Sequence, residues 1–404
     1  MKNFLDKFFS RSKNLDYISQ NLKQITLTTP ANKIFEAINN FSEKSEIRYV
    51  GGCVRKVIKK ENVDDIDLAT NLTPLEVCEA LKNKQISYYE TGIEHGTITA
   101  IIDEYKYEIT SLRKDVSTDG RHAEVEFSLD WKEDASRRDF TINSIYADGD
   151  GNLFDPFNGK KDIENRNINF IGNPEQRINE DPVRLLRAIR FHAKLEFSLG
   201  LTLGNIKKLI PLLDNIPYSR IFDEMMKFFL TGHAKKSIFV LKEYQLLDLF
   251  FPFLSNHSLD KNSLLIHGMN NTDSRVKADK TVNPGFLMAV ILWDAFNHSL
   301  KNNDSKLTLD TQIKHFFNKT DPNIFIHNRF IKYISEIWRL QPRFTKLKTR
   351  SVYRLSNHPR FRAAYDFLLL RCSSDQEEKR YGEWWTKWQE ASEASRKKLL
   401  ITKE

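Results

Sequence analysis

The sequence predicts an α+β head followed by a long helical region. Strand-like runs that alternate in polarity mix with helical runs from about residue 26 to 150. From Asp181 onward, helical periodicity dominates nearly to the C-terminus, and turn-rich segments at 148–151 and 155–159 mark the change. We expect four parts: an N-terminal helical extension (1–25), the α+β head (26–150), a hinge and helical neck (151–255), and a helical body and tail (256–404).

The head elements follow from local patterns. Residues 31–40 and 54–60 read as helices, and 47–50 and 66–69 as strands. Thr73-Pro74 predicts the start of a helix that runs through Leu81, because Thr is a good N-cap and Pro fits the first turn. Residues 97–102 and 105–112 alternate around Asp103-Glu104 and predict a hairpin. The head should therefore contain a mixed or antiparallel sheet.

Composition bounds the class of protein. The chain has 404 residues, of which 40% are hydrophobic, as is typical of ordered globular domains. Its formal charge of +8 and pI near 9.1 favour a polyanionic partner. Three scattered cysteines argue against a disulfide framework, and no run approaches the roughly 20 apolar residues of a membrane span. The basic N-terminal segment has no apolar signal core, so we expect a cytoplasmic protein with no membrane partner.

One segment pairs a basic glycine turn with two carboxylates. Gly51-Gly52 precedes Arg55, and glycine lets backbone N–H groups approach a phosphate while arginine adds a planar donor. Asp65 and Asp67 are two residues apart on a predicted strand and so project to one face. Their repulsion is relieved by a cation, and Mg²⁺ prefers oxygen ligands. The alternative for the Asp pair is a solvated strand edge.

Two further segments carry charged groups of complementary kinds. Arg138 and Asp139 lie in the run RRDFTIN, where an arginine can meet phosphate and an aspartate can accept from a ribose hydroxyl; the alternative is a solvated turn. On the next helix, Asp181 stands at the start and a stripe with i, i+3, i+6 spacing follows, formed by Arg184, Arg187 and Arg190. An acceptor beside a donor can mimic the pairing edge of a base. The alternative is an N-cap with an exposed basic face.

The order of these motifs resembles the class II tRNA nucleotidyltransferase family. That family contains CCA-adding enzymes and bacterial poly(A) polymerases, and it belongs to the polymerase β superfamily. The resemblance rests on GGxVR followed by DxD, RRDFTIN, DPFNGKKDI and EDxxRxxRxxRF, and covers roughly residues 45–250. It implies a polymerase β-like head followed by an all-helical neck, body and tail.

The resemblance also implies roles for single residues. Asp65 and Asp67 would hold Mg²⁺, with Glu108 as a candidate third carboxylate. Gly52, Arg55, Arg138 and Asp139 would contact the triphosphate and ribose of the incoming nucleotide. Asp181 and Arg184 would pair with the base of CTP or ATP, supported by Arg187 and Arg190. The family usually has an acidic residue after the loop arginine, where this chain has Lys56.

The resemblance implies untemplated addition of CCA to the 3′ end of tRNA from CTP and ATP, with release of pyrophosphate. Residues 115–127 resemble a loop associated with addition of the final A, and 91–97 resemble the CCA-adding head, with no arginine-rich segment there of the kind that marks the bacterial poly(A) polymerases. An A-adding enzyme, a poly(A) polymerase and an inactive RNA-binding module remain the alternatives. The oligomeric state stays open, with a monomer favoured.

The C-terminal region holds arginines interleaved with aromatic residues. Arg360, Arg362 and Arg371 lie near Tyr365 and Phe367, a composition that can grip an RNA backbone and stack on bases. We expect the aromatic residues here to pack in a helical core, with only some arginines reaching RNA. The same core role is expected for the tryptophans of the EWWTKW run at 383–388.

Overall fold

The computed structural model describes residues 17–118, 123–251, 254, 259–302, 307–319, 326 and 328–401. Residues 1–16 of the expected N-terminal extension lie outside the described residues, while 17–28 are helical. The chain divides into two compact units. Unit 1 comprises 1–192 and 196–205, and unit 2 comprises 193–195 and 206–404. The predicted four-part division remains a prediction.

Unit 1 is built on a seven-stranded mixed sheet with the order β3-β4-β5-β2-β1-β8-β9. Its strands are β1 (Ile47–Val50), β2 (Ile66–Thr70), β3 (Ser87–Gly92), β4 (Thr97–Ile102), β5 (Tyr105–Ser111), β8 (Tyr146–Ala147) and β9 (Leu153–Phe154). The β2–β5 pair is parallel, while the other neighbouring pairs are antiparallel. The mixed sheet and the β4–β5 hairpin confirm the predictions for the head.

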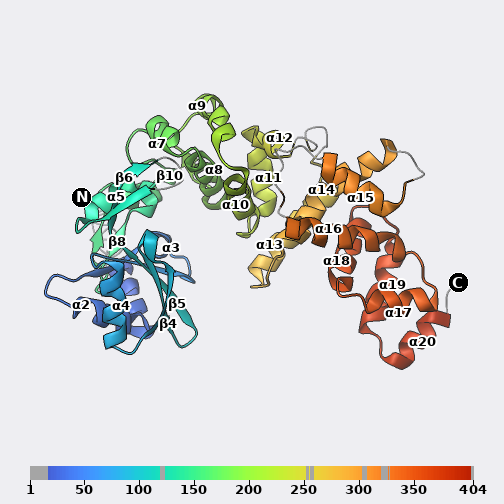
Figure 1. Cartoon of the computed structure of the whole chain (residues 1–404), viewed down its shortest axis with the longest axis horizontal. Coiled ribbons are helices and arrows are strands. Elements are labelled where there is room, and N and C mark those ends of the chain that lie inside the picture. Colours follow the sequence, from blue (N-terminus) through green and yellow to red (C-terminus); the bar gives the residue numbers. More distant parts are fainter. Residues whose placement is uncertain are drawn as a thin grey trace, which may run out of the picture. The chain divides into compact units, whose positions relative to one another are not determined.

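The helices of unit 1 include every helix predicted in the head. They are α2 (Ala31–Asn39), α3 (Gly52–Ile58), α4 (Pro74–Asn83), α5 (Trp131–Arg137), α6 (Gly159–Glu164), α7 (Pro174–Glu180) and α8 (Val183–Leu195) (Figure 1). α4 begins with a capping box, in which the Thr73 hydroxyl accepts from Glu76 N and the Glu76 carboxylate accepts from Thr73 N. This capping box confirms the helix start predicted at Thr73.

Two small sheets complete unit 1. β6 (Arg113–Thr118) pairs antiparallel with β7 (Ala123–Phe127), and β10 (Asn167–Ile168) pairs parallel with β11 (Ser198–Leu199). An apolar cluster lies where β1, β2 and α5 meet, and its members include Val50, Ala69, Trp131 and Tyr146. This core holds α5 against the sheet, and the segment RRDFTIN begins at Arg137, the last residue of α5, and leads towards β8.

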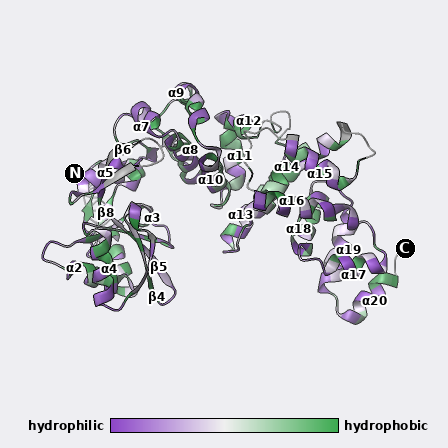
Figure 2. Ribbon diagram, in the orientation of Figure 1, coloured by the Kyte–Doolittle hydropathy of each residue, from purple (hydrophilic) through white to green (hydrophobic). Residues whose placement is uncertain are grey.

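Unit 2 is helical throughout its described residues. Its helices are α9 (Leu203–Leu209, which begins in unit 1), α10 (Tyr218–Phe229), α11 (Ala234–Glu243), α12 (Leu246–Phe250), α13 (Leu264–Lys277), α14 (Pro284–Asn302), α15 (Leu309–Lys319), α16 (Asn328–Leu340), α17 (Thr349–Ser356), α18 (Phe361–Ser373), α19 (Lys379–Glu390) and α20 (Glu393–Ile401). α14 is hydrophobic along most of its length and buried from Leu287 to Trp293 (Figure 2). No described helix is long and apolar enough to cross a bilayer.

The aromatic residues near the C-terminus form a core. Trp385 and Trp388 are almost fully buried and pack with Phe344, Phe361 and Tyr365. The Trp385 indole N–H donates to the Phe344 carbonyl oxygen at 2.9 Å. These contacts confirm the packing role predicted for the aromatic residues of α18 and α19.

Candidate active site

The sequence motifs meet at one cavity of about 570 Å³ in unit 1. Of the eleven predicted site residues, those that line it are Gly52, Arg55, Asp67, Arg138, Asp139, Asp181, Arg184 and Arg187. Asp65, Glu108 and Arg190 are not among the described residues that form the cavity wall. The motifs, up to about 130 residues apart in sequence, therefore converge in one place.

Three carboxylates interact at one side of the site. Asp67 lies on β2 directly opposite Glu108 of β5 in the parallel pair, and Asp65 is exposed just before β2 begins. Burial raises the pKa of Asp67, and Glu108 and Asp65 raise it further, whereas Arg138 and Arg55 lower it. A carboxylate whose pKa is raised by its neighbours is one that a cation would relieve.

The donor set fits a metal ion that takes few protein ligands. In the part of the chain that the structure describes, no three His, Cys, Asp or Glu side chains are grouped closely enough to hold a metal by themselves. Mg²⁺ is usually held by one or two carboxylates and completes its shell with water and substrate phosphates. Asp65 and Asp67 fit that pattern, while Glu108 is exposed and acts on Asp67 through its charge.

The glycine turn brings the backbone close to charged side chains. Gly51 has φ +68°, a left-handed conformation that favours glycine, and α3 starts directly after it. A side chain at Gly52 would place its Cβ 3.8 Å from Asp67 Oδ2 and 3.9 Å from Arg55 Nη2. The turn therefore brings the backbone at Gly52 close to both the Asp67 carboxylate and the Arg55 guanidinium.

Arg55 is a buried cation at the cavity. Its Nη1 donates to Asn143 Oδ1, and its guanidinium carbon lies 5.1 Å from the Phe191 ring centroid. Burial lowers the pKa of Arg55, while Asp139 opposes that shift. An arginine keeps its charge under such conditions, so Arg55 presents a desolvated positive charge that an anion can neutralise.

Lys56, where the family usually has an acidic residue, forms its own ion pair. Lys56 Nζ donates to Asp64 Oδ1, in the segment that leads into β2. Lys56 thus pairs with an acidic residue of a neighbouring segment and does not supply Arg55 with the acidic neighbour that is usual in the family. This contact connects α3 to the segment that carries Asp65.

Asp134 fixes the two arginines of the RRD run. Its carboxylate is 1% exposed, and Oδ1 accepts from Arg137 Nε at 2.8 Å and Nη2 at 2.6 Å. Oδ2 accepts from Arg138 Nε and Nη2, both at 3.2 Å, and from the Tyr146 hydroxyl at 2.6 Å. Burial lowers the pKa of Arg138, but Tyr146 and Asp134 outweigh this and raise it. Both guanidiniums are held as cations at the cavity wall.

Asp139 accepts hydrogen bonds on one oxygen and forms an ion pair through the other. Oδ1 accepts from Phe140 N at 2.9 Å and from Asn143 Nδ2 at 3.2 Å, and Oδ2 lies 2.9 Å from Arg187 Nη2. Arg187, predicted to support nucleotide binding, thus contacts Asp139. A ribose hydroxyl would have to share Asp139 with these donors.

The start of α8 presents the predicted acceptor and donor side by side. Asp181 Oδ1 accepts from Val183 N, the first residue of α8, at 3.3 Å, while the N-cap position of α8 is Pro182 and not Asp181 as the alternative interpretation had it. Arg184 Nη1 donates to Glu180 Oε2 and to the Arg177 carbonyl oxygen, both at 2.8 Å. The carboxylate of Glu180 therefore orients Arg184 at the cavity. Arg190 lies over the Phe191 ring at 4.8 Å.

Five cavity residues were not predicted from the sequence to belong to the site. They are Thr97, Thr110, Arg113, Asn143 and Phe191. Gly51 and Arg137 also line the cavity, and they belong to the glycine turn and the arginine pair that the sequence did single out. Asn143 lies inside the RRDFTIN motif and Phe191 ends the EDxxRxxRxxRF motif, so both were within motifs already identified. Thr97 and Thr110 face each other across β4 and β5, with hydroxyls 3.4 Å apart. The predicted hairpin of 97–102 and 105–112 already implied that these strands pair, but no local signal indicated that the two threonines line the cavity.

Within the segment 115–127, most of β6 pairs antiparallel with β7. Residues 119–122 lie outside the described residues. Its resemblance to the loop associated with addition of the final A stays a prediction.

Three family models match the chain. The poly A polymerase head domain matches residues 47–169, and the probable RNA and SrmB-binding site of polymerase A matches 201–257. The polymerase A arginine-rich C-terminus matches 302–404. This last match lies far from residues 91–97, where the sequence had argued against a poly(A) polymerase.

The similar proteins are of two kinds, poly(A) polymerases and CCA tRNA nucleotidyltransferases. Poly(A) polymerase I of Salmonella typhimurium is 30% identical over 382 residues, which cover 88% of this chain and 81% of that protein. The mitochondrial CCA tRNA nucleotidyltransferase 1 of Homo sapiens is 42% identical over 204 residues, which cover 49% and 47%. A tRNA nucleotidyltransferase solved with a primer tRNA and an incoming ATP analog has a TM-score of 0.57 and 20% identity, covering 91% of this chain and 98% of that one. At that identity the likeness shows the fold.

Proposed function

The chain belongs to the family of class II tRNA nucleotidyltransferases and bacterial poly(A) polymerases, and from this membership we propose that it adds nucleotides from NTPs to an RNA 3′ end without a template. The observation that carries the proposal is the single cavity in which the carboxylate of Asp67 meets the cations Arg55, Arg138 and Arg184. Carboxylates for a metal and arginines for phosphates are the two parts that phosphoryl transfer needs.

Different side chains would contact the phosphates, the ribose and the base of the incoming nucleotide. Arg55 and Arg138 neutralise the triphosphate and the departing pyrophosphate, and Asp134 holds Arg138 in place. Asp139 accepts from the ribose, and Asp181 with Arg184 selects the base. Asp65 and Asp67 would hold Mg²⁺, which supplies charge neutralisation and activates the RNA 3′-hydroxyl. No protein nucleophile is required, because positioning and electrostatics carry this chemistry.

Two products compete. Addition of CCA to tRNA from CTP and ATP is indicated by the sequence motifs and supported by the 42% identity to the human enzyme. Polyadenylation from ATP is supported by matches that run along most of the chain and by the C-terminal match at 302–404. We favour polyadenylation, because its support includes the body and tail, whereas the match to the human enzyme covers about half of the chain.

Purified full-length chain with Mg²⁺ and defined RNAs separates these functions. A tRNA transcript that ends at the discriminator base is incubated with CTP alone, with ATP alone and with both nucleotides. A transcript that ends in CC and an unstructured RNA are each incubated with ATP alone. Long A-tails on both RNAs with ATP, and no CMP on the tRNA, support polyadenylation. CMP incorporation that stops after CCA supports the CCA-adding alternative, and AMP added once to a tRNA ending in CC supports an A-adding enzyme. No incorporation with any pair contradicts catalysis altogether.

A further inference from the structure

Unit 2 contains a cavity of about 300 Å³ that combines cations with aromatic rings. It lies among α13, the loop at 281–283, the start of α14, α16 and the start of α18. The residues that matter most for its chemistry are Arg275, Phe286, Tyr333, Arg360, Arg362 and Asp366. All of them belong to unit 2.

Tyr333 provides an aromatic wall that is held firmly. The guanidinium carbon of Arg360 lies 4.7 Å from the Tyr333 ring centroid, and Arg360 Nε donates to Glu336 Oε2 at 2.8 Å. A Cβ added at Gly285 would lie 3.0 Å from Tyr333 Cδ1, so the glycine lets the ring pack closely against the start of α14. Tyr333 is half-buried and lines the cavity, so part of its side chain stays open to a bound group beside Arg360.

The polar groups of the cavity offer both signs of charge. Asp366 is 25% exposed at its side chain and accepts from Arg362 Nε at 3.3 Å, with Arg362 Nη2 3.1 Å from its other oxygen. Burial raises the pKa of Asp366, while Arg362 and Arg275 lower it. Arg362 itself is 71% exposed and stands at the rim. The cavity thus has a carboxylate acceptor inside and a cation outside.

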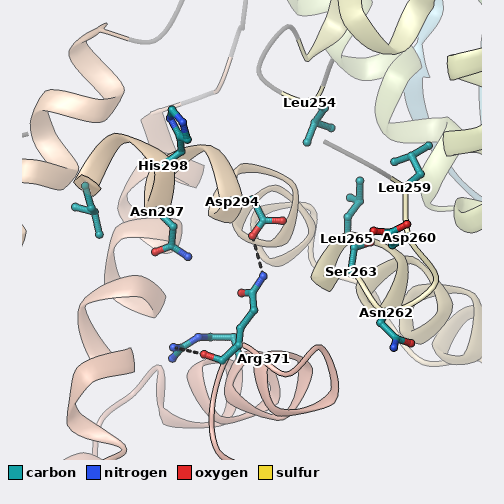
Figure 3. Close-up of a pocket in the computed structure, with 12 residues that line it drawn as sticks. Leu254, Leu259, Asp260, Asn262, Ser263, Leu265, Asp294, Asn297, His298 and Arg371 are labelled. Carbon is teal, nitrogen blue, oxygen red and sulfur yellow. Dashed lines mark hydrogen bonds between the residues drawn. The ribbon is translucent and has the colours of Figure 1, made fainter. Parts of the chain in front are cut away.

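The charge of the surrounding region favours a polyanion. Residues 302–404 contain 21 Lys and Arg against 12 Asp and Glu, a net of +9, so the other 301 residues are close to neutral. A second cavity in unit 2, of about 800 Å³, differs in kind: Asp260 and Asp294 line it, and Asp294 accepts from Gln376 (Figure 3). Its wall also adjoins segments outside the described residues. The smaller cavity is the better match to phosphate and base.

We propose that the cavity at Tyr333 binds one nucleotide of the RNA acceptor, with the base stacked on Tyr333 and the adjoining phosphate at Arg362. Single-stranded RNA is held by aromatic rings that stack on bases and by arginines that contact phosphates. Asp366 accepts from an exocyclic amino group of the base, as carboxylates do in base recognition. The inference rests on the proposed function, because it gives the RNA substrate a second contact away from the catalytic cavity.

The test measures RNA binding by the full chain. A 5′-fluorescein-labelled 12-nucleotide oligoadenylate is titrated, and anisotropy gives Kd for wild type, Tyr333→Ala and Arg362→Glu. Stacking on one base is worth about 1–3 kcal/mol, so Tyr333→Ala is expected to weaken binding roughly tenfold. Arg362→Glu should weaken it similarly and lower the slope of log K against log salt by roughly 0.7 for each phosphate that the variant no longer neutralises.

Arg380→Glu is the matched control. Arg380 lies on α19, its side chain is 69% exposed, and its carboxylate partner is Glu378, just as the partner of the 71% exposed Arg362 is Asp366. The control should bind RNA within twofold of wild type. An equal loss in Arg380→Glu would reduce the effect to net charge and overturn the proposal. So would unchanged RNA affinity in Tyr333→Ala and Arg362→Glu, which is the result expected if the cavity serves a protein partner.

Two more measurements separate the possible failures. Competition with AMP tests whether the cavity binds a free nucleotide rather than RNA. If AMP displaces the labelled oligomer as well as the same concentration of unlabelled oligomer does, the cavity is not an RNA site. AMP incorporation at saturating RNA should keep its wild-type kcat in Tyr333→Phe and Arg362→Glu, while KM for RNA rises in Arg362→Glu. If wild type incorporates no nucleotide, the proposed function is wrong, but the comparison of Kd values still shows whether the cavity binds RNA.

Discussion

Asp134 Oδ2 lies 3.2 Å from both Nε and Nη2 of Arg138, and it also accepts the Tyr146 hydroxyl at 2.6 Å. One nearly inaccessible carboxylate therefore holds an arginine that lines the candidate active-site cavity. Its other oxygen holds Arg137 in the same way. The arginines proposed to meet phosphate are oriented before any substrate arrives, as electrostatic catalysis requires.

Asp134→Asn should lower the free energy of unfolding by roughly 3–5 kcal/mol, because it leaves two arginines without the carboxylate that compensates them. Denaturant unfolding measures the loss. Tyr146→Phe is the control, since it removes one hydrogen bond to the same carboxylate and keeps the charges. A loss in Asp134→Asn no larger than that in Tyr146→Phe would show that the ion pairs contribute little.

The same carboxylate should make stability depend on acid. Burial raises the pKa of Asp134, but Arg138, Arg137 and Tyr146 outweigh this and hold it below its usual value. The stabilisation is fully present above the unfolded pKa of about 3.9 and is lost as pH falls through the lower folded pKa. Unfolding curves of wild type and Asp134→Asn should therefore differ most near neutral pH and converge in acid. A gap that stays constant down to pH 2 would argue against the linkage.

Most of the motif residues that the sequence singled out line one cavity, because each motif carries its own charged groups. Asp67, Arg55 and Arg184 were found from charge, glycine and helical spacing. Asp134 was not, since an aspartate in the first turn of a helix reads as a solvated residue, and only packing of α5 on β8 buries it. Glu180 was likewise quoted in its motif without a role, which depends on where Arg177 and Arg184 point. Local patterns predict elements and reactive groups, but not the tertiary partners that orient them.

Asp67→Asn should stabilise the metal-free chain and abolish its response to Mg²⁺. Burial, Glu108 and Asp65 raise the pKa of Asp67, so the ionised form is disfavoured in the folded state, and the contribution of Asp67 to stability should rise as pH falls through the folded pKa towards the unfolded value of about 3.9. The neutral amide removes this repulsion. Thermal unfolding without nucleotide, with and without Mg²⁺, measures both effects.

For Asp67, wild type should gain thermal stability with Mg²⁺ and Asp67→Asn should not. Glu79→Gln is the control, because Glu79 is an exposed carboxylate on α4. An equal Mg²⁺ response in wild type and Asp67→Asn would remove Asp67 from the metal site, whatever the catalytic activity of the variants.

Base selection should depend on Glu180 as well as Arg184. Arg184→Ala should reduce the ratio of kcat/KM for the preferred NTP over its competitor about tenfold, equivalent to about 1.4 kcal/mol, before overall activity is lost. Glu180→Gln should shift the ratio in the same direction by less, since it releases the Arg184 guanidinium. Glu175→Gln, an exposed change on the same helix α7, is the control. Unchanged selectivity in Arg184→Ala would place base choice elsewhere.

Gly159→Ala should displace the RRDFTIN segment, although Gly159 itself does not line the cavity. An added Cβ would lie 2.1 Å from the Thr141 carbonyl oxygen and 2.9 Å from Ile145 Cγ1, so backbone must move. Thr141 sits between Arg138 and Asn143 in the RRDFTIN run, and its hydroxyl donates to Asp162 of α6 at 2.6 Å. We expect a loss of at least about 1–3 kcal/mol in unfolding free energy, together with lower kcat/KM.

Gly204→Ala is the matched control, because its Cβ would meet its nearest atom at 3.9 Å and a helical alanine stabilises by up to about 1 kcal/mol. Equal unfolding free energies for the two variants would mean that α6 and the RRDFTIN segment are not packed as tightly as the contacts indicate.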